Sequence, residues 1–353
     1  MSSDKPILGI IGGGQLGSML CQAAKKLNIS TTILTDDLHA PAQNFCDTFV
    51  HSDYKNSSAL EKFAKSCDYI TFEFENISFE ILKKISAITK VNPDPNINKI
   101  VQNRFTEKNF LKTLGIATTS YTFIKSKIDI EKNQNLLPGI LKTCTLGYDG
   151  KGQHVISSME DVKDDWCFAS DYILEKFIDL KQEISVIITR YSDGGLSIFE
   201  PIENIHKEQI LNTSIIPAKI NSEICDEAKT IAKKISEKLK YTGTMCVEFF
   251  IDKKNKLYVN EIAPRVHNSG HLTINAFNIS QFENHVRAVC GLEKIELQKK
   301  SDAKMVNIIG DEINKYRGKL LNKNQFLFDY QKKEIKDKRK MGHITTLLDT
   351  KDS

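Results

Sequence analysis

The chain has no long apolar run. None of its hydrophobic stretches approaches the roughly 18 residues that a transmembrane helix needs, which excludes a membrane-spanning protein. Its net charge is only +4 over 353 residues, and this balance does not favour nucleic-acid binding. Internal repeats and low-complexity segments are also missing, so a repeat architecture is not expected. The opening residues are polar and the apolar run 7–11 ends in glycines, so we expect no signal peptide.

Cysteine pairing motifs are also lacking. Eight cysteines are present, but no two of them form a CxxC pair, and most lie in apolar surroundings. That pattern is typical of reduced core thiols in a cytoplasmic protein. A hydrophobic content of 40% and a charged content of 27% are ordinary globular values, and the length suggests two or three domains.

Residues 244–271 place two carboxylates opposite each other. Two β-rich runs flank the polar tetrapeptide KKNK, which predicts a hairpin with a four-residue loop. In that register Asp252 pairs with Leu257, and Glu248 pairs with Glu261. Like charges in opposed positions repel, so the pair needs a counter-ion, and hard oxygen ligands select Mg²⁺.

Two interpretations of this pair remain open: two solvated glutamates on an exposed sheet face, or a metal site. A strict period of two puts Glu261 on the same face as Val259 and Leu257. The loop after Glu261 contains several hydrogen-bond donors, as an anionic substrate beside a metal requires. These donors are Arg265, His267, Asn268 and His271.

The first 100 residues alternate strands with helices, which predicts an open parallel α/β sheet. A breaker and one connecting helix follow, then short strands around a glycine-rich loop, then a larger α+β unit and a lysine-rich end. The predicted strands are 7–11, 31–34, 69–74, 183–189, 305–309 and 326–330, and the predicted helices are 99–114, 225–239 and 279–290.

The first glycine loop matches the dinucleotide-binding pattern. Gly12, Gly14 and Gly17 satisfy G-x-G-x-x-G between a strand and a helix, and Asp36 lies where a ribose-binding acid would. Taken alone, this pattern predicts a nicotinamide dehydrogenase. The geometry demands only a tight turn with available N–H groups at a helix N-terminus, however, and that suits any phosphate.

The second glycine loop differs in kind. Gly147-Tyr148-Asp149-Gly150-Lys151-Gly152-Gln153 follows a strand that carries Lys142. Such a flap can cover polyphosphate with its backbone N–H groups while its lysine adds positive charge, although a plain surface turn is the alternative. The spacing is not that of a P-loop. Flap, strand lysine and acidic hairpin together favour ATP with Mg²⁺ over a dinucleotide.

Several segments carry a specific resemblance, and they run in order across nearly the whole chain: IIGGGQLGSML, TFEFENI, NRFTEKNFL, GYDGKGQ, MCVEFF, NEIAPRVHNSGH and RKMGH. The chain resembles ATP-grasp enzymes, and within them the N5-carboxyaminoimidazole ribonucleotide synthetases of purine synthesis. The resemblance implies a Rossmann-like N-terminal domain that binds no dinucleotide, an ATP-grasp fold and a small C-terminal β-rich subdomain. The implied bounds are 1–105 for the first domain, 106–180 for the lid, 181–295 for the large ATP-grasp subdomain and 296–353 for the last.

The implied activity is a two-step carboxylation. ATP phosphorylates bicarbonate to carboxyphosphate, and the amine of 5-aminoimidazole ribonucleotide is then carboxylated. A homodimer is expected from the resemblance. The nearest rival is another ATP-grasp ligase, such as a formate-dependent glycinamide ribonucleotide transformylase, and an NAD-dependent oxidoreductase is a more distant one.

The resemblance also implies roles for single residues. Arg104 and Lys142 contact the ATP phosphates beneath the flap 147–153, and Glu248 and Glu261 hold Mg²⁺. The remaining nucleotide contacts are Glu175, Lys176, Phe177 and Ile178 along the adenine, Glu183 at the ribose, His206, and Asn260 beside the metal.

The carboxylation half involves a second set. Arg265, His267 and Lys340 hold bicarbonate and carboxyphosphate, whose charge they offset. Asp149 either accepts the amine proton or only caps its turn. The residues that face the aminoimidazole nucleotide are Gln15, Leu16, Glu73, Asn268, Arg339 and Lys340. The chain departs from the family pattern at Ser18 and Asn212, where relatives usually have arginine.

Overall fold

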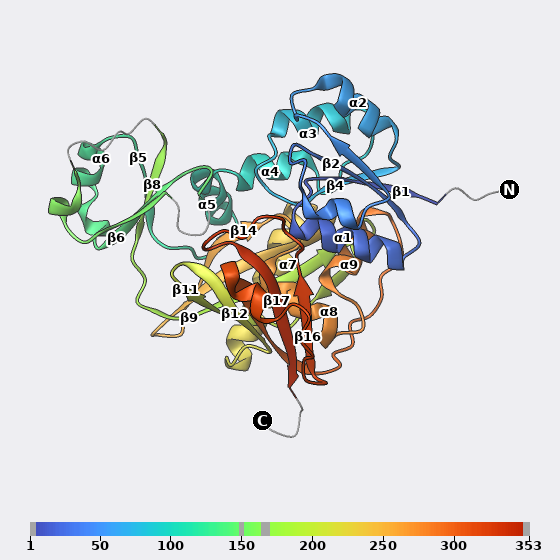
Figure 1. Ribbon diagram of the computed structural model, residues 1–353. Helices are drawn as coiled ribbons and strands as arrows, with labels where there is room; N and C mark the ends of the chain where they lie inside the picture. The colour runs from blue at the N-terminus through green and yellow to red at the C-terminus, as the bar shows by residue number, and fades with distance from the viewer. Residues whose placement is uncertain (1–4, 148–151, 164–169, 349–353) are drawn as a thin grey trace.

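The N-terminal part is an open parallel sheet, as predicted. The computed structural model describes residues 5–147, 152–163 and 170–348. Four parallel strands in the order β3-β2-β1-β4 form the first sheet (Figure 1). Their bounds are β1 Ile7–Ile11, β2 Ser30–Thr35, β3 Thr48–His51 and β4 Tyr69–Phe72, and the helices are α1 Gln15–Lys26, α2 Ser57–Lys65 and α3 Phe79–Ser86. In parallel sheets the carboxyl ends of the strands carry ligand sites, and both β1 and β4 end beside the first glycine loop.

The connecting helix predicted over 99–114 is two helices, so that prediction was wrong. The chain forms α4 (Pro95–Val101) and then α5 (Arg104–Thr113). The break arises at Asn103, whose side chain accepts hydrogen bonds from the backbone N–H groups of Phe105 and Thr106 and so begins a new helix. The consequence is functional, because Arg104 becomes the first residue of α5 and faces the cavity described below.

A small antiparallel sheet forms a separate lobe, on the left in Figure 1. Its order is β5-β8-β6-β7, with α6 (Lys127–Lys132) packed beside it. The bounds are β5 Tyr121–Ile124, β6 Gly139–Thr143, β7 Gln153–Ile156 and β8 Tyr172–Lys176. Lys142 and Gln153 are paired across β6 and β7, so the second glycine loop closes this hairpin.

The largest sheet combines the ATP-grasp segment with the C-terminal segment. Its path is β14-β13-β9-β11-β12-β15-β17-β16, with β10 paired to β9. The C-terminal strands therefore extend the central sheet, and they include β17, which the sequence prediction missed. The bounds are β9 Leu180–Arg190, β10 Leu196–Ile198, β11 Ile202–Lys207, β12 Ile210–Ile216, β13 Gly243–Asp252, β14 Leu257–Ala263, β15 Asp302–Ile309, β16 Gln325–Asp329 and β17 Lys340–Leu348.

Helices cover this sheet on both sides. α7 (Ser222–Lys238) packs on β9 and β13 to form the main core, and α9 (Gln281–Val289) packs between β13 and α1 of the first sheet. Short helical turns precede α9, namely the 3-10 turn η4 (Asn268–Leu272) and α8 (Thr273–Ala276). The apolar contact of α9 with α1 joins the N-terminal sheet and its helices to the largest sheet.

The acidic hairpin forms with a bulge. Glu248 pairs with Glu261 as predicted, but Leu257 pairs with Ile251, so the predicted pairing with Asp252 was wrong. The register shifts by one residue between Glu248 and Phe249, which leaves one extra residue on β14.

The bulge also reverses a predicted face. Val259 and Leu257 lie in the core under α7, whereas Glu261 lines the cavity on the opposite side. The strict period of two was therefore wrong for these residues, because an extra residue re-aims the side chains that follow it.

No helix in the described part of the chain is long and apolar enough to cross a membrane. The seven described cysteines form no disulfide, and five of them are buried.

Candidate functional site

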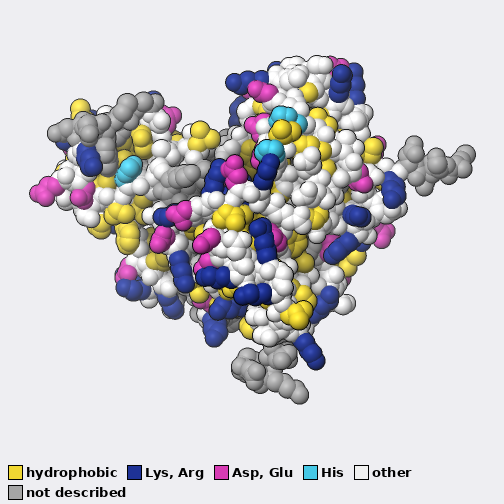
Figure 2. All heavy atoms as spheres, viewed as in Figure 1, with side chains coloured by type: hydrophobic (Ala, Val, Ile, Leu, Met, Phe, Trp, Pro, Cys, Tyr) yellow, Lys and Arg dark blue, Asp and Glu magenta, His cyan; other side chains and the backbone are white. Residues whose placement is uncertain are grey.

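A cavity of about 1560 Å³ opens where the three sheets meet. Figure 2 shows the molecule notched between the small lobe and the N-terminal lobe, with acidic and basic side chains next to each other at the notch. Nearly all predicted site residues of the described chain line this cavity. They are Gln15, Leu16, Glu73, Arg104, Lys142, Gly147, Gln153, Glu175, Lys176, Phe177, Ile178, Glu183, His206, Glu248, Asn260, Glu261, Arg265, His267, Asn268, Arg339 and Lys340.

Part of the predicted flap lies outside the described residues, namely Tyr148, Asp149, Gly150 and Lys151. Gly152 is described, and it is not among the lining residues. Its φ is +71°, and a Cβ there would lie 2.6 Å from Oγ1 of Thr143, so only glycine fits.

The lysine predicted to contact ATP phosphate belongs to a buried charge cluster. Nζ of Lys142 lies 3.0 Å from Oε2 of Glu175, and Nζ of Lys108 lies 3.4 Å from Oε1. Oγ1 of Thr119 also donates to this carboxylate. Burial disfavours the charged form of Glu175, but the two ammonium groups hold its pKa at about 2. The side chain of Glu175 is therefore engaged by Lys142 and Lys108.

The acidic hairpin presents an oxygen-rich patch. Oε2 of Glu261 lies 2.9 Å from Nη1 of Arg104, and Oε1 of Glu248 lies 2.9 Å from Nε2 of His267. Each carboxylate thus has a cationic partner, which offsets the repulsion between the two like charges. Oδ1 of Asn260, the residue beside the bulge, is buried and has no hydrogen-bond partner within the described chain.

This donor set fits a hard divalent cation. Two carboxylates and an unsatisfied amide oxygen on one hairpin are the oxygen ligands that Mg²⁺ prefers. Burial opposes ionisation of Glu248, but His267 keeps the pKa of its carboxyl at about 2, so this ligand is charged at neutral pH.

Arg265 and His267 are fixed by neighbours. Arg265 forms a two-pronged ion pair with Glu75, a residue that sequence reasoning did not assign. Oγ of Ser269 lies 2.8 Å from Nδ1 of His267 and orients its ring. Burial opposes protonation of His267, but Cys246 and Glu248 raise its pKa to about 10. The loop therefore places two cations at the cavity wall.

His271 was expected among the donors of this loop, and that expectation was wrong. Its ring is fully buried, does not line the cavity, and packs against His343 and Phe282. Asn268 does line the cavity, but its amide is paired with Asn307. The short turn η4 directs these side chains inward, which no linear spacing predicts.

His206 and Glu183 form a pair from neighbouring strands. Nδ1 of His206 lies 3.0 Å from Oε2 of Glu183, and both side chains are about one quarter exposed, at 26% and 24%. Burial opposes protonation of His206, but the hydrogen bond that its ring donates to the Glu183 carboxylate raises its pKa. The pair offers a carboxylate oxygen and a ring at one end of the cavity.

The first glycine loop is occupied by a side chain of the chain itself. Glu73, at the end of β4, accepts hydrogen bonds from the backbone N–H groups of Gly14 and Gly17. It is 7% exposed, and a Cβ on Gly14 would lie 2.6 Å from its carboxylate. These N–H groups are the ones that would bind a dinucleotide pyrophosphate, so the carboxylate excludes that ligand.

The C-terminal basic segment reaches the same end of the cavity. Nζ of Lys332 donates to Oε1 of Gln15 and to the backbone oxygen of Lys340. Arg339 and Lys340 line the cavity beside it, at the start of β17. Basic side chains thus face the first glycine loop across the cavity.

Sequence reasoning missed several residues of the site. Glu75 follows Glu73 by two positions at a strand end, and this alternation was a usable signal. Glu107 and Lys108 carry no signal of their own, because they read as ordinary surface residues of a polar helix. Burial, and then Glu261, raise the pKa of Glu107 to about 8, and its Oε1 accepts from the backbone N–H of Ile262 at 2.6 Å.

Comparisons with known proteins agree with this geometry. The Ribonucleotide synthetase preATP-grasp domain matches residues 6–102, the ATP-grasp domain residues 109–282, and the Phosphoribosylaminoimidazole carboxylase C-terminal domain residues 303–353. The N5-carboxyaminoimidazole ribonucleotide synthase of Brucella melitensis is 41% identical over 346 residues, which is 96% of each chain. That of Bacillus subtilis is 37% identical and covers 98% of this chain and 92% of its own.

Solved structures of N5-carboxyaminoimidazole ribonucleotide synthases are also similar to this chain. The Staphylococcus aureus N5-carboxyaminoimidazole synthetase complexed with ADP superposes with a TM-score of 0.91 at 37% identity, covering 98% of this chain and 93% of that one. The Aspergillus clavatus synthase in complex with ADP and 5-aminoimidazole ribonucleotide has a TM-score of 0.88 at 28% identity, covering 98% and 94%. The chain therefore belongs to the N5-carboxyaminoimidazole ribonucleotide synthase family of ATP-grasp enzymes.

Proposed function

We propose that this chain carboxylates 5-aminoimidazole ribonucleotide to N5-carboxyaminoimidazole ribonucleotide, using ATP and bicarbonate. The observation that carries the proposal is that Lys142, the Glu248–Glu261 hairpin and the Arg265–His267 loop line the same cavity as the first glycine loop. The residues proposed to bind the ATP phosphates and those proposed to bind bicarbonate and the substrate nucleotide therefore line one cavity. The near full-length likeness to synthases of this name supports the same conclusion.

The nucleotide half positions ATP. Arg104 and Lys142 hold the phosphates, and the main chain of 175–178 lies along the base, where the half-exposed ring of Phe177 offers an apolar face. Glu183 accepts from the ribose hydroxyls, with His206 as a further contact. Because phosphoryl transfer depends mostly on positioning and charge stabilisation, no nucleophilic side chain is required.

Mg²⁺ belongs to this proposal, with Glu248 and Glu261 as its ligands and the amide oxygen of Asn260 beside them. When bound, such an ion neutralises charge on the transferring phosphoryl group. Arg104 and His267, which pair with these carboxylates, then become available to phosphate and bicarbonate.

The second half carries the carboxylation. Bicarbonate oxygen takes the γ-phosphoryl group, and ADP leaves. The substrate amine then forms a bond to the carboxyphosphate carbon, the carbon–oxygen bond to phosphate breaks, and the amine loses one proton. Arg265, His267 and Lys340 offset the anionic charge during these steps.

The aminoimidazole nucleotide occupies the remaining end of the cavity. Gln15, Leu16, Glu73, Asn268 and Arg339 surround it. Glu73 already accepts hydrogen bonds from the N–H groups of the first glycine loop. The substrate phosphate is therefore better placed against the basic residues at the start of β17.

The test is ADP release with ATP, bicarbonate and 5-aminoimidazole ribonucleotide, with each omitted in turn. Full turnover should require all three, and a bicarbonate-free reaction should lose it. Turnover with glycinamide ribonucleotide and formate instead would favour the rival ligase. Glu261→Gln serves as the matched inactive control.

We also propose a cytoplasmic homodimer. The free thiols of the described chain suit a reducing compartment. Light scattering after size-exclusion chromatography measures the assembly, and a monomer mass at working concentration would overturn the dimer.

A further inference from the structure

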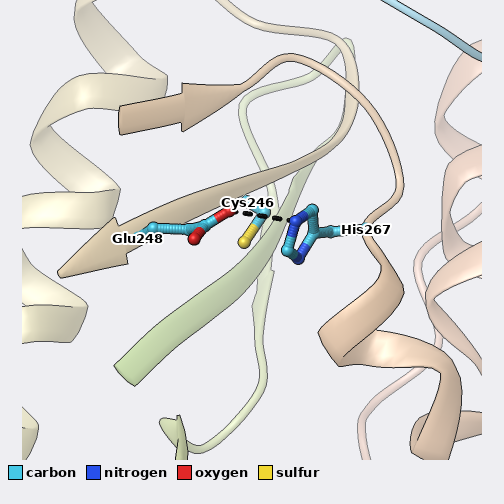
Figure 3. Close-up of side chains that lie close together, drawn as sticks. All are labelled: Cys246, Glu248 and His267. Carbon is cyan, nitrogen blue, oxygen red and sulfur yellow. Dashed lines mark ion pairs between the residues drawn. The ribbon is translucent and has the colours of Figure 1, made fainter. Parts of the chain in front are cut away.

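Three side chains of types that can bind a metal, each of different chemistry, lie close together at and just behind the cavity wall. Cys246 and Glu248 lie two residues apart on β13, so both point to the same face of the sheet. His267 reaches them from the loop after β14 (Figure 3). One ligand atom from each of the three lies within 4.8 Å of the other two.

The chemistry of this trio differs from that of the oxygen-rich patch. Thiolate and imidazole favour Zn²⁺ and Co²⁺, whereas Mg²⁺ prefers oxygen. In a tetrahedral zinc site, bonds of about 2.0–2.3 Å place neighbouring ligand atoms about 3.3–3.8 Å apart. The Glu248–His267 contact of 2.9 Å would widen and the longer separations would shorten, so adjustments near 1 Å suffice.

The surroundings suit a bound ion. Oγ of Ser269 holds Nδ1 of His267 and leaves Nε2 aimed at the site, as metal-ligating histidines require. Glu248 and His267 line the cavity with side chains 13% and 14% exposed, and Cys246 lies fully buried behind them. An ion entering from the cavity would therefore meet Glu248 and His267 first and Cys246 last.

We propose that Zn²⁺, or Co²⁺ as its spectroscopic substitute, binds Cys246 Sγ, Glu248 and His267 and inhibits the enzyme. Binding releases the thiol proton and the ring proton to solvent. The ion takes Glu248 away from the nucleotide metal and His267 away from the anionic substrate. The inhibition rests on the proposed function, whereas the binding does not.

The first test is independent of activity. Co²⁺ is titrated into the full-length, metal-free protein, and thiolate ligation gives a near-ultraviolet charge-transfer band. The wild type and the control Cys144→Ala, which removes the one thiol among the described residues that lines the cavity, should both show the band. Cys246→Ala should lose it, and added Zn²⁺ should abolish it in the wild type. A wild-type protein that gives no thiolate band overturns the proposal.

The second test measures Zn²⁺ inhibition of ADP release at saturating ATP and Mg²⁺. Cys246→Ala should need at least tenfold more Zn²⁺ for half inhibition, while Cys144→Ala should match the wild type, so chelation by ATP cancels in the comparison. Equal sensitivity of the wild type and Cys246→Ala overturns the inhibitory role. Circular dichroism checks folding, and Cys246→Ser replaces the alanine variant if that variant does not fold. If the chain lacks the proposed activity, the cobalt spectrum still decides binding.

Discussion

Replacing Glu175 with glutamine tests the buried charge cluster beneath the proposed phosphate site. Its carboxylate is 2% exposed and bridges Lys142 at 3.0 Å and Lys108 at 3.4 Å. Glutamine keeps the shape but removes the charge, so two ammonium groups would lose the carboxylate that they share. Burial already lowers the pKa of Lys108, and this change would lower it further.

The magnitude follows from the pKa of Glu175. Burial works against its ionisation, yet the lysines lower that pKa from 4.5 to about 2. At about 1.4 kcal/mol per pKa unit, the charged form is stabilised by roughly 3–4 kcal/mol at neutral pH. Breaking a buried ion pair by removing one partner typically costs about 3–5 kcal/mol, which agrees. Because the folded pKa is depressed, this stability is present above pH 4.5 and is lost as pH falls toward 2.

Equilibrium urea unfolding of wild type, Glu175→Gln, Lys108→Met and the double variant measures this. The double variant restores the net charge of the cluster, so it should be more stable than Glu175→Gln alone by more than about 1 kcal/mol. An unfolding free energy of Glu175→Gln within about 0.5 kcal/mol of wild type would refute the reasoning.

Two further predictions concern the site, and a third concerns a buried histidine outside it. Glu261→Gln should cut turnover by orders of magnitude. It should change the unfolding free energy by less than about 1 kcal/mol, because the ion pair of Glu261 with Arg104 is partly exposed. A clear loss of stability would contradict this. Glu248→Gln should instead destabilise the fold by about 3 kcal/mol, because the ion pair of Glu248 with His267 is buried. Equal stability of Glu248→Gln and Glu261→Gln in urea unfolding would count against this difference. Burial lowers the pKa of His285 to about 4, so stability should fall by about 2 kcal/mol between pH 6.5 and 5 as the unfolded chain takes up the proton. His285→Gln should reduce that slope in urea titrations, and an unchanged slope would mean that other groups cause it.

The strict alternation of a hairpin predicts only part of the site. The pairing of Glu248 with Glu261 is confirmed, but the predicted register beside the loop was off by one residue, and the bulge in β14 compensates for that offset. The same rule fails for Val259 and Leu257, because a bulge inserts one residue that no composition or spacing reveals. A register argument therefore reached the Glu248–Glu261 pair only because two offsets cancel, and it placed Val259 and Leu257 on the wrong face.

Other parts of the site depend on contacts between distant segments. Lys108 and Glu175 are 67 positions apart and meet only because α5 packs against the small lobe. Likewise, Asn103 splits one predicted helix into two, and that split places Arg104 at the cavity. Helix periodicity was correct on either side of Asn103, but it did not predict that the side-chain cap of Asn103 begins a second helix.

The first glycine loop shows why a fingerprint alone misleads. Its spacing, strand and helix all match a dinucleotide site, and the fold around it is confirmed as an open parallel sheet. What differs is the residue at the end of β4. Glu73 places a carboxylate on the N–H groups of Gly14 and Gly17, so a pyrophosphate would meet both an occupied site and a like charge. The same local geometry thus holds the Glu73 carboxylate at the cavity wall. A titration with NADH followed by fluorescence should accordingly show no saturable binding at millimolar concentrations, and saturable binding would mean that the carboxylate can be displaced.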